Sequence, residues 1–485
     1  MEKALNYKNL RLKIGLELHV QLDTQHKLFC NCSTSMKEKT PTNTVSRKLH
    51  PVASEMGGID AAAEFEYLRD RAFIYQVFNN ESCLVELDEE PPHKINPEAF
   101  DLALQISLLL NCEIPNEIQI MRKVVIDGSN TSGFQRTAII GLNGHVVYKG
   151  KKIPIAQVSV EEDAAAIVGD ENGNVTYRLN RLGIPLVEIG TGVLEGYTPA
   201  QIQEIAYLIG VMTRSTGKTK HGIGSIRQDM NVSIKNGPRI EIKGIQELGI
   251  LSKVIELEVR RQLSEKVKEE TRAFNPDGTT KFLRPLPGAE RMYPETDLLP
   301  ISISNEYTDK IRRDLPEPWT RKVERFKVKM KLPEGLATEI LNSEYLDLFE
   351  EIVDKTKVDP TIVANTFVSI LKDLQRREKV EIERIPENRF MELFDALDKK
   401  KFVKEAIPQI VKYLATYPQD GVEEALKELN LKPATAGEVK DITKEVLDKS
   451  ANMPFEKVYG IVMSKVRGRI DAQDVMKVVK GMVKK

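Results

Sequence analysis

The sequence predicts an α+β protein with a large mixed-sheet domain in residues 1–300, a helical domain in residues 301–412 and a small helical tail domain in residues 413–485. Before residue 300, runs of alternating polar and apolar residues are broken by Gly, Pro and Asn and interspersed with helical patterns. After residue 300, helical periodicity punctuated by prolines replaces the strand signal. A chain of 485 residues is long enough for roughly two to four domains.

The expected strands precede residue 300. Residues 15–22, GLELHVQL, alternate strictly and place Leu16, Leu18, Val20 and Leu22 on one face. Three further stretches are rich in β-branched residues, namely residues 151–168, 175–192 and 224–245. Helices are expected in residues 96–112 and 198–217, the latter opening with a Thr N-cap followed by Pro. Beyond residue 300, residues 307–355, 364–378 and 388–400 have helical periodicity.

Composition excludes several classes of protein. The formal net charge is −1, and no run approaches the roughly 18 apolar residues that would span a bilayer. The N-terminus lacks the apolar core of a secretory signal, so we expect a cytoplasmic protein without a membrane association. The near-zero net charge neither requires nor excludes a nucleic-acid partner, because basic residues can gather on one face.

The first candidate site is the polar face of residues 15–22. Glu17, His19 and Gln21 alternate with the aliphatic residues and therefore share one face of the expected strand. A carboxylate beside an imidazole suits a divalent metal or acid–base chemistry. The alternative is the solvated polar face of an edge strand.

Three adjacent acids, Glu161, Glu162 and Asp163, follow the next alternating run. Burying three acids is costly unless a cation lies among them. Mg²⁺ is a suitable cation, because it binds one or two carboxylates together with phosphate oxygens. A solvated turn is the alternative. Further along, Gly183 and Pro185 interrupt a strand pattern and place Arg181 and Glu188 near an irregular element, where sites often lie.

Two other segments suit phosphate groups. Arg227, Asp229 and Asn231 alternate and share one strand face, a combination that suits phosphate and metal. The loop DGSNTSGFQRT, residues 127–137, carries the candidate nucleotide-binding residues Ser129, Asn130 and Arg136. Its backbone amides could hold an anion, although it matches no P-loop and an ordinary turn is the alternative.

The cysteines supply half of a metal site. Cys30 and Cys32 form a C-x-C pair, whereas a structural zinc site normally needs four ligands. No second close cysteine pair follows, and His26 and His50 are only nearby in sequence. We therefore do not expect zinc, nor structural disulfides among the four cysteines of a cytosolic chain.

The C-terminal stretch is basic. From Lys465 to the end, seven basic residues face two acids, which gives a net charge of +5. Such a helix is a candidate phosphate-contacting surface, and a solvated helix face is the alternative.

Five motifs in order resemble one family. GLELHVQLDTQHKLFCNCST, SVEEDAA, LNRLGIPLVEIGT, GSIRQDMNVSI and EIKGIQEL are similar to the large subunits of tRNA-dependent amidotransferases, the GatB/GatE family. The resemblance covers essentially the whole chain and implies a cradle-shaped, kinase-like amidotransferase domain followed by the two helical domains. MRKVVIDGSNTSGFQRT and CLVELDEEPPHKIN resemble the archaeal GatE branch, and the C-P-x-C pair of the GatB branch is absent.

One departure concerns an inserted domain. Members of the GatE branch usually carry an insert resembling one in bacterial aspartyl-tRNA synthetases, just before the segment that here reads KEETRA. This chain passes straight through RRQLSEKVKEETRAFNPDG and leaves no room for the insert. Any tRNA contacts that the insert makes are therefore expected to be missing.

The resemblance implies ATP-dependent conversion of Glu-tRNA(Gln) to Gln-tRNA(Gln), with Mg²⁺, through a γ-phosphoryl intermediate that ammonia attacks. It implies an asparaginase-like partner, GatD, which supplies the ammonia, and a heterotetramer of two GatD and two GatE chains. The metal-centred site would comprise Glu17, His19, Glu161, Glu162 and Asp163. Arg181, Arg227, Asp229 and Asn231 would bind phosphate or organise the ligands, and the basic tail would contact tRNA.

Two other functions share some of these features. A tRNA-independent, ATP-dependent carboxylate–amine ligase would use the same acyl-phosphate chemistry without a basic tail. A non-catalytic tRNA-binding protein would bind tRNA without hydrolysing ATP.

Overall fold

The computed structural model describes residues 5–53, 57–171, 173–220, 226–275, 277–288, 291–341, 343, 345–431, 434–449, 453–466, 469–470 and 472–483. The chain forms two compact units, Met1–Trp319 and Thr320–Lys485. The first unit extends past residue 300 because α5 (Asn305–Arg313) packs against α2 (Pro97–Leu109), where the Tyr307 hydroxyl donates to the Asp101 carboxylate. The division of the second unit at residue 412 stays a prediction.

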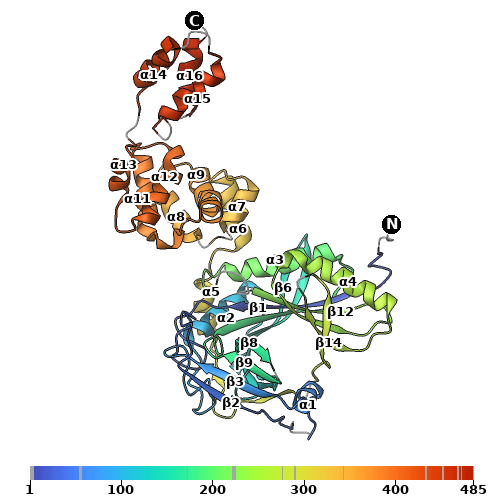
Figure 1. Ribbon diagram of the computed structural model, residues 1–485. Helices are drawn as coiled ribbons and strands as arrows, with labels where there is room; N and C mark the ends of the chain where they lie inside the picture. The colour runs from blue at the N-terminus through green and yellow to red at the C-terminus, as the bar shows by residue number, and fades with distance from the viewer. Residues whose placement is uncertain are drawn as a thin grey trace. The chain divides into compact units, whose positions relative to one another are not determined.

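A large mixed sheet organises the first unit, as the sequence predicted (Figure 1). Across the sheet the strands follow the order β15 (Thr280–Arg284), β14 (Glu270–Phe274), β13 (Ile240–Ile245), β12 (Ile226–Ser233), β1 (Lys13–Gln21), β10 (Pro185–Thr191), β7 (Lys151–Glu162), β6 (Phe134–Tyr148), β5 (Ile120–Val124) and β16 (Met292–Pro294). A short strand, β11 (Leu194–Glu195), pairs with one end of β1. Pairing is antiparallel except between β13 and β14, which makes the sheet mixed.

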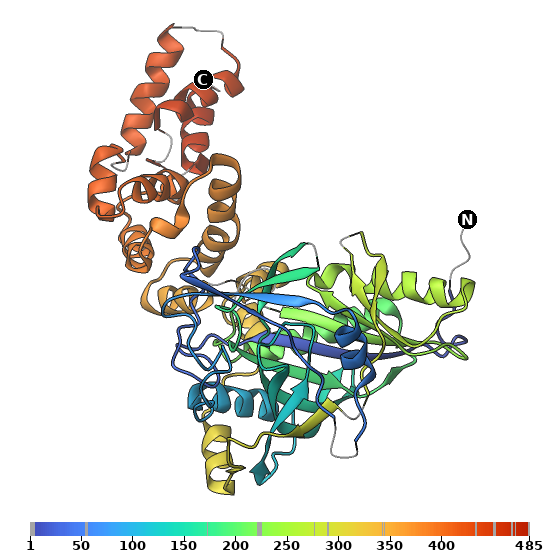
Figure 2. The same ribbon diagram turned by 60° about the horizontal axis from the view of Figure 1, so that its bottom comes forward.

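The apolar face of this sheet carries the main core. Leu16 and Leu18 of β1 are at most 1% exposed and belong to one cluster with residues of the helices that cover this face. These helices are α2, α3 (Pro199–Arg214) and α4 (Leu251–Ser264), and the last runs along the sheet in both views (Figures 1 and 2). Alternation therefore leaves the polar residues of β1 on the opposite face.

Side chains cap the starts of two helices, and the cap of α3 was predicted from the sequence. Thr198 caps α3 through a capping box with Gln201, and Pro199 occupies the first helical position. Asn96 caps α2 by accepting hydrogen bonds from the backbone amides of Glu98 and Ala99. Both helices thus begin where the sequence placed them.

A second sheet of four strands faces the polar side. Its order is β2 (Asn43–Arg47), β3 (Ala72–Val77), β9 (Asn174–Arg178) and β8 (Ala166–Glu171). Its small core contains Phe73, Tyr75 and Tyr177. The described part of this unit also contains α1 (Ala61–Leu68) and a short pair, β4 (Glu117–Ile118) with β17 (Ile301–Ser302).

The second unit is helical in its described residues, in agreement with the loss of strand signal after residue 300. Its helices are α6 (Trp319–Val328), which starts at the last residue of the first unit, α7 (Glu334–Leu341), α8 (Leu346–Lys355), α9 (Pro360–Asn365), α10 (Leu371–Glu378), α11 (Glu387–Asp398), α12 (Ile407–Thr416), α13 (Val422–Glu428), α14 (Ala436–Lys449), α15 (Phe455–Val466) and α16 (Ala472–Val483). The last three helices pack around their own valine-rich core. Among the described residues, no helix is long and apolar enough to cross a membrane.

The connection between α4 and β14 bears on the inserted domain. α4 ends at Ser264 and β14 begins at Glu270, so residues 265–269 join them directly. β14 then pairs with β13 in parallel, and the sheet continues without interruption. The connection therefore contains no folded insert, as the sequence indicated.

Candidate active site

Polar side chains form a row across the centre of the large sheet. The antiparallel register pairs His19 of β1 with Glu188 of β10 on one side and with Arg227 of β12 on the other. Glu17 is paired with Asp229 in the same way. Directly paired residues point to the same face, so these side chains gather on the face away from the helices. β1 is a central strand, and the edge-strand alternative is therefore wrong.

A cavity of about 720 Å³ lies over this row. The candidate residues that line it are Glu17, His19, Ser129, Asn130, Glu161, Asp163, Arg181, Arg227, Asp229 and Asn231. Its lining also includes residues outside the predicted set, among them Lys123, Glu188, Glu241, Lys243, Arg239, Arg284 and Arg291. Acids at the centre and five arginines in the lining make the cavity suited to a cation with anionic groups around it.

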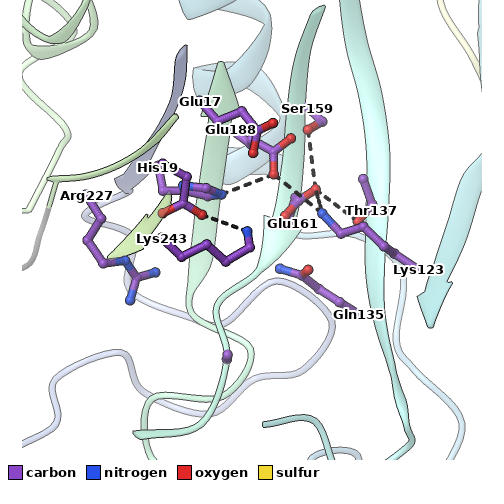
Figure 3. Close-up of polar contacts among 12 residues, drawn as sticks. Glu17, His19, Lys123, Gln135, Thr137, Ser159, Glu161, Glu188, Arg227 and Lys243 are labelled. Carbon is purple, nitrogen blue, oxygen red and sulfur yellow. Dashed lines mark hydrogen bonds and ion pairs between the residues drawn. The ribbon is translucent and has the colours of Figure 1, made fainter. Parts of the chain in front are cut away.

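His19, Glu161 and Glu188 form the centre of the site (Figure 3). One ligand atom from each lies within 4.8 Å of the others. His19 Nε2 is 3.1 Å from Glu188 Oε2, and Lys123 Nζ donates to Glu161 Oε1 at 2.6 Å and to Glu188 Oε2 at 3.4 Å. Glu161 Oε2 is buried and has no hydrogen-bond partner within the described part of the chain. A buried carboxylate oxygen without a partner is costly, and a bound cation would satisfy it.

The charges of this centre depend on one another. Burial lowers the pKa of His19, but the hydrogen bond to Glu188 and the charges of Asp229 and Glu188 outweigh it and raise the pKa above its ordinary value. Burial raises the pKa of Glu188, but Lys123 and His19 hold it well below its usual range. Glu188 is therefore an anion, and a divalent cation here would take the place of the His19 proton.

A second group of charges lies beside the first. Lys243 of β13 bonds Asp229 at 2.8 Å and Glu241 at 2.9 Å. Burial raises the pKa of Asp229, but Lys243 and His19 hold it below its ordinary value. Burial, together with the charges of Glu188, Asp229 and Glu241, raises the pKa of Glu17 despite the opposing Lys243. Glu17 thus accepts a proton more readily than an ordinary glutamate.

Asp163 lines the cavity but is held by cations of its own. Arg227 donates to its Oδ1 at 2.8 Å, Arg181 lies 3.9 Å from its Oδ2, and Gln21 donates to the same Oδ2. Burial raises the pKa of Asp163, but the two arginines outweigh it and lower the pKa. Asp163 therefore anchors the two arginines, and it does not belong to the His19 cluster as the sequence interpretation supposed.

Glu162 and Arg136 do not line the cavity. Glu162 follows Glu161 in β7 and points to the opposite face, where its Oε2 lies 3.5 Å from the Arg136 guanidinium. Arg136 also donates to Glu295 at 2.8 Å. Both residues therefore lie outside the candidate site. All three acids of the run are at most 6% exposed, so the solvated-turn alternative is wrong as well.

The loop before β6 contributes to the cavity wall. Ser129 and Asn130 line the cavity, and Asn130 is 2% exposed. The loop is fixed at Gly128, whose φ of +90° favours glycine and whose carbonyl accepts from the Tyr75 hydroxyl at 2.9 Å. A Cβ at Gly128 would lie 2.2 Å from the Phe73 ring. The loop thus presents Ser129 and Asn130 from a conformation that only glycine fits.

Sequence reasoning noted Glu188 near an irregular element without assigning it to the metal centre, and it did not single out Lys123 or Lys243. Glu188 lay within a quoted motif, and its alternation with buried Val187 and Ile189 placed it on the polar face. Lys123 and Lys243 also lay within quoted motifs, MRKVVIDGSNTSGFQRT and EIKGIQEL, but a single lysine in a strand is ordinary and neither was singled out. Only the pairing of β5 with β6 and of β12 with β13 brings them to the row.

The basic tail lies in the second unit. Lys465 bonds Glu445 at 3.2 Å, Arg469 bonds Glu438 at 2.8 Å and Lys477 bonds Asp474 at 3.1 Å. Arg467, Asp471, Lys484 and Lys485 lie outside the described residues. Exposed pairs such as those of Lys465 and Lys477 contribute little and exchange readily for other anions.

Two family models match the chain. Residues 12–309 match the GatB/GatE catalytic domain, and residues 347–483 match a model described as the GatB domain. The chain belongs to the GatB/GatE family. Among its relatives, the GatE subunit of glutamyl-tRNA(Gln) amidotransferase from Methanocaldococcus jannaschii is 34% identical over 99% of both chains. The protein of the same name from Aeropyrum pernix is 34% identical over 98% of this chain and 97% of its own.

The alignments with these two GatE relatives are longer than this chain. The alignment with the Methanocaldococcus jannaschii protein spans 628 positions, whereas this chain has 485 residues. At least 143 aligned positions, the difference of these two numbers, therefore have no counterpart here. A gap of this size agrees with the missing inserted domain.

Proposed function

We propose that the chain is the large subunit of a tRNA-dependent amidotransferase that converts Glu-tRNA(Gln) to Gln-tRNA(Gln) with ATP. The observation that carries the proposal is the His19, Glu161 and Glu188 centre inside an arginine-lined cavity of a GatB/GatE catalytic domain. The relatives are named as GatE subunits of glutamyl-tRNA(Gln) amidotransferase, and these names support the substrate.

The residues of the centre fit Mg²⁺. Glu161 and Glu188 offer two carboxylates close together, one with an orphaned buried oxygen, and His19 adds a nitrogen. Mg²⁺ is bound in proteins by one or two carboxylates together with water and substrate phosphates. When bound, the ion would neutralise charge between the carboxylate of the substrate and the phosphates of ATP.

The proposed reaction has two steps. A γ-carboxylate oxygen of the tRNA-bound glutamyl group attacks the γ-phosphorus of ATP, and ADP leaves. Ammonia then attacks the carbonyl carbon of the acyl phosphate, phosphate leaves, and the nitrogen loses one proton to give the amide. Both steps bring anions together, so the cavity must offset negative charge while it excludes water.

Residues at different positions in the cavity would have different roles in the reaction. Lys123, between Glu161 and Glu188, holds these two carboxylates in place. Arg227 and Arg181, fixed by Asp163, present guanidinium groups to phosphate oxygens. Glu17, whose raised pKa favours protonation, would take the proton that the attacking nitrogen releases.

The partners follow from the same proposal. The tail domain, with its basic residues, would contact the phosphate backbone of tRNA(Gln). An asparaginase-like protein, GatD, would supply ammonia in a heterotetramer of two chains of each kind in the cytoplasm. Because the inserted domain is missing, this chain would discriminate among tRNAs through fewer contacts.

The test is formation of Gln-tRNA(Gln) from Glu-tRNA(Gln) with ATP, Mg²⁺ and free ammonium, which removes the need for the ammonia-supplying partner. The parent chain should form the amide, and His19→Ala and Glu17→Ala should abolish it while tRNA binding stays within a few-fold. Glu204→Gln, on the exposed surface of α3, is the matched control and should behave as the parent. Normal amide formation by both site variants would refute the site assignment.

The same assay separates the rival functions. ATP-dependent amide formation on a small carboxylate that persists after deletion of residues 415–485 would favour a tRNA-independent ligase. Tight tRNA binding without Mg²⁺-dependent ATP hydrolysis would favour a non-catalytic tRNA-binding protein. Loss of tRNA-dependent turnover on that deletion, with ATP hydrolysis retained, supports the amidotransferase.

A further inference from the structure

Three cysteines and a glutamate meet outside the active-site cavity. They are Cys30, Cys32, Cys83 and Glu86, and one ligand atom from each lies within 4.8 Å of all the others. None of the four lines the cavity of the active site. The sequence argument against zinc rested on the lack of a second close cysteine pair, and the fold supplies other ligands from a distant loop.

Two loops provide these ligands. Cys30 and Cys32 follow β1 as a C-x-C pair, and Cys83 and Glu86 lie 51 and 54 positions after Cys32 in a C-x-x-E turn. The backbone amide of Cys32 points at Cys30 Sγ at 3.4 Å, and the amide of Cys83 donates to Glu86 Oε2 at 2.7 Å. These amide contacts hold the side chains of each loop toward a common centre.

One measured pair of ligand atoms is at the separation of a filled site, and the other pair is closer together. Cys30 Sγ lies 2.8 Å from Glu86 Oε1, and Cys32 Sγ lies 3.7 Å from Glu86 Oε2. Zn–S bonds of about 2.3 Å in a tetrahedron place ligand atoms about 3.8 Å apart, so a small adjustment of the group would complete a coordination shell. The cysteines are free, so no disulfide uses these sulfurs.

The surroundings are those of a closed site. Cys30 is 4% exposed and Glu86 is 5% exposed. Lys27, whose side chain is fully buried, lies 3.4 Å from Glu86 Oε1. With the four ligands deprotonated, Zn²⁺ and Lys27 together offset three of the four negative charges, which lowers the cost of burying the group.

We propose that Cys30, Cys32, Cys83 and Glu86 form a structural Zn²⁺ site that fastens the C-x-C loop to the C-x-x-E turn. Thiolates select zinc among the common divalent ions, and four protein ligands leave no open position for chemistry. Thr131 Oγ1 donates to the carbonyl oxygen of Glu86, and Thr131 belongs to the loop that carries Ser129 and Asn130. Through this hydrogen bond, the zinc site would stabilise the loop that forms part of the cavity wall.

The test loads the full chain with zinc, removes unbound zinc by desalting, and measures the zinc that remains bound per chain. The parent should retain one zinc per chain, and Cys30→Ser and Cys83→Ser should lose most of it. Cys112→Ser is the matched control, because Cys112 is buried elsewhere, near the Leu110 carbonyl and Gly144, and should leave the zinc content unchanged. Glu86→Gln should weaken retention without abolishing it, since three thiolates remain.

Cobalt provides a readout that does not depend on the folding of any variant. Co²⁺ in place of zinc in the parent chain should give ultraviolet thiolate-to-metal bands and the intense visible absorption of a tetrahedral site. Removal of the metal by a chelator should lower the Tm of the parent and not that of Cys83→Ser. A parent chain that retains neither metal, or an equal loss of zinc in Cys112→Ser, would overturn the proposal.

Discussion

His19 lies opposite Glu188 in neighbouring antiparallel strands, with its Nε2 3.1 Å from Glu188 Oε2. The two residues are 169 positions apart in the chain, and the register of β1 with β10 alone makes them neighbours. Lys123 approaches the same oxygen from β5, so one carboxylate links three strands. Glu188 therefore connects His19 to Lys123 at the centre of the site.

We expect Glu188→Gln to raise the Mg²⁺ concentration that gives half-maximal ATP hydrolysis by at least about tenfold. The reason is that a neutral amide replaces an anionic ligand. Measuring the rate of ATP hydrolysis against Mg²⁺ concentration checks this, with Glu195→Gln, at an exposed position of β11, as the control. An unchanged Mg²⁺ dependence would remove Glu188 from the metal centre.

The neighbours Glu161 and Glu162 should respond differently to the same substitution. Glu161→Gln removes a proposed ligand and should lower the ATP hydrolysis rate about 100-fold or more with little loss of stability. Glu162→Gln removes one of the two carboxylate partners of buried Arg136 and should cost about 2 kcal/mol of unfolding free energy while the folded protein keeps its rate. ATP hydrolysis rates and urea unfolding of both variants test this prediction. A lower rate in Glu162→Gln together with a lower stability in Glu161→Gln would show that the strand faces are misassigned.

Gly128→Ala should destabilise the protein by more than about 2 kcal/mol and weaken ATP binding, because the new methyl group would overlap the Phe73 ring. Gly150→Ala is the matched control, since Gly150 also has a positive φ, +77°, but has nothing within 4 Å of a Cβ. The control should cost only about 1 kcal/mol of backbone strain. Urea unfolding of both variants measures the difference, and equal costs would contradict the packing argument.

Glu295 should make stability depend on pH in the acid range. Burial raises its pKa, but hydrogen bonds and charge from Arg122 and Arg136 outweigh this and lower the pKa from 4.5 to about 2. A lowered carboxyl pKa stabilises the fold above about pH 4.5, and this contribution is lost as the pH falls toward about 2. The unfolding midpoint of the parent should therefore exceed that of Glu295→Gln near neutral pH, and the gap should narrow below about pH 4.5. A gap independent of pH would show that Glu295 titrates normally in the folded state.

The sequence by itself determined the class of fold and half of the active-site row. Alternation in β1 and β12 placed Glu17, His19, Arg227 and Asp229 on polar faces, because side chains in a strand alternate whatever their partners are. Capping residues set the start of α3 for the same local reason. These features depend on neighbours within a few residues, which the sequence shows directly.

The tertiary structure decided which polar residues meet. It joined Glu188 and Lys123 to His19, turned Glu162 and Arg136 away from the cavity, and brought Cys83 and Glu86 to the C-x-C pair. Each of these outcomes depends on strand register or on loop packing between segments tens to hundreds of residues apart. Register is set by the burial of the apolar face of the whole sheet, and no local pattern contains that information.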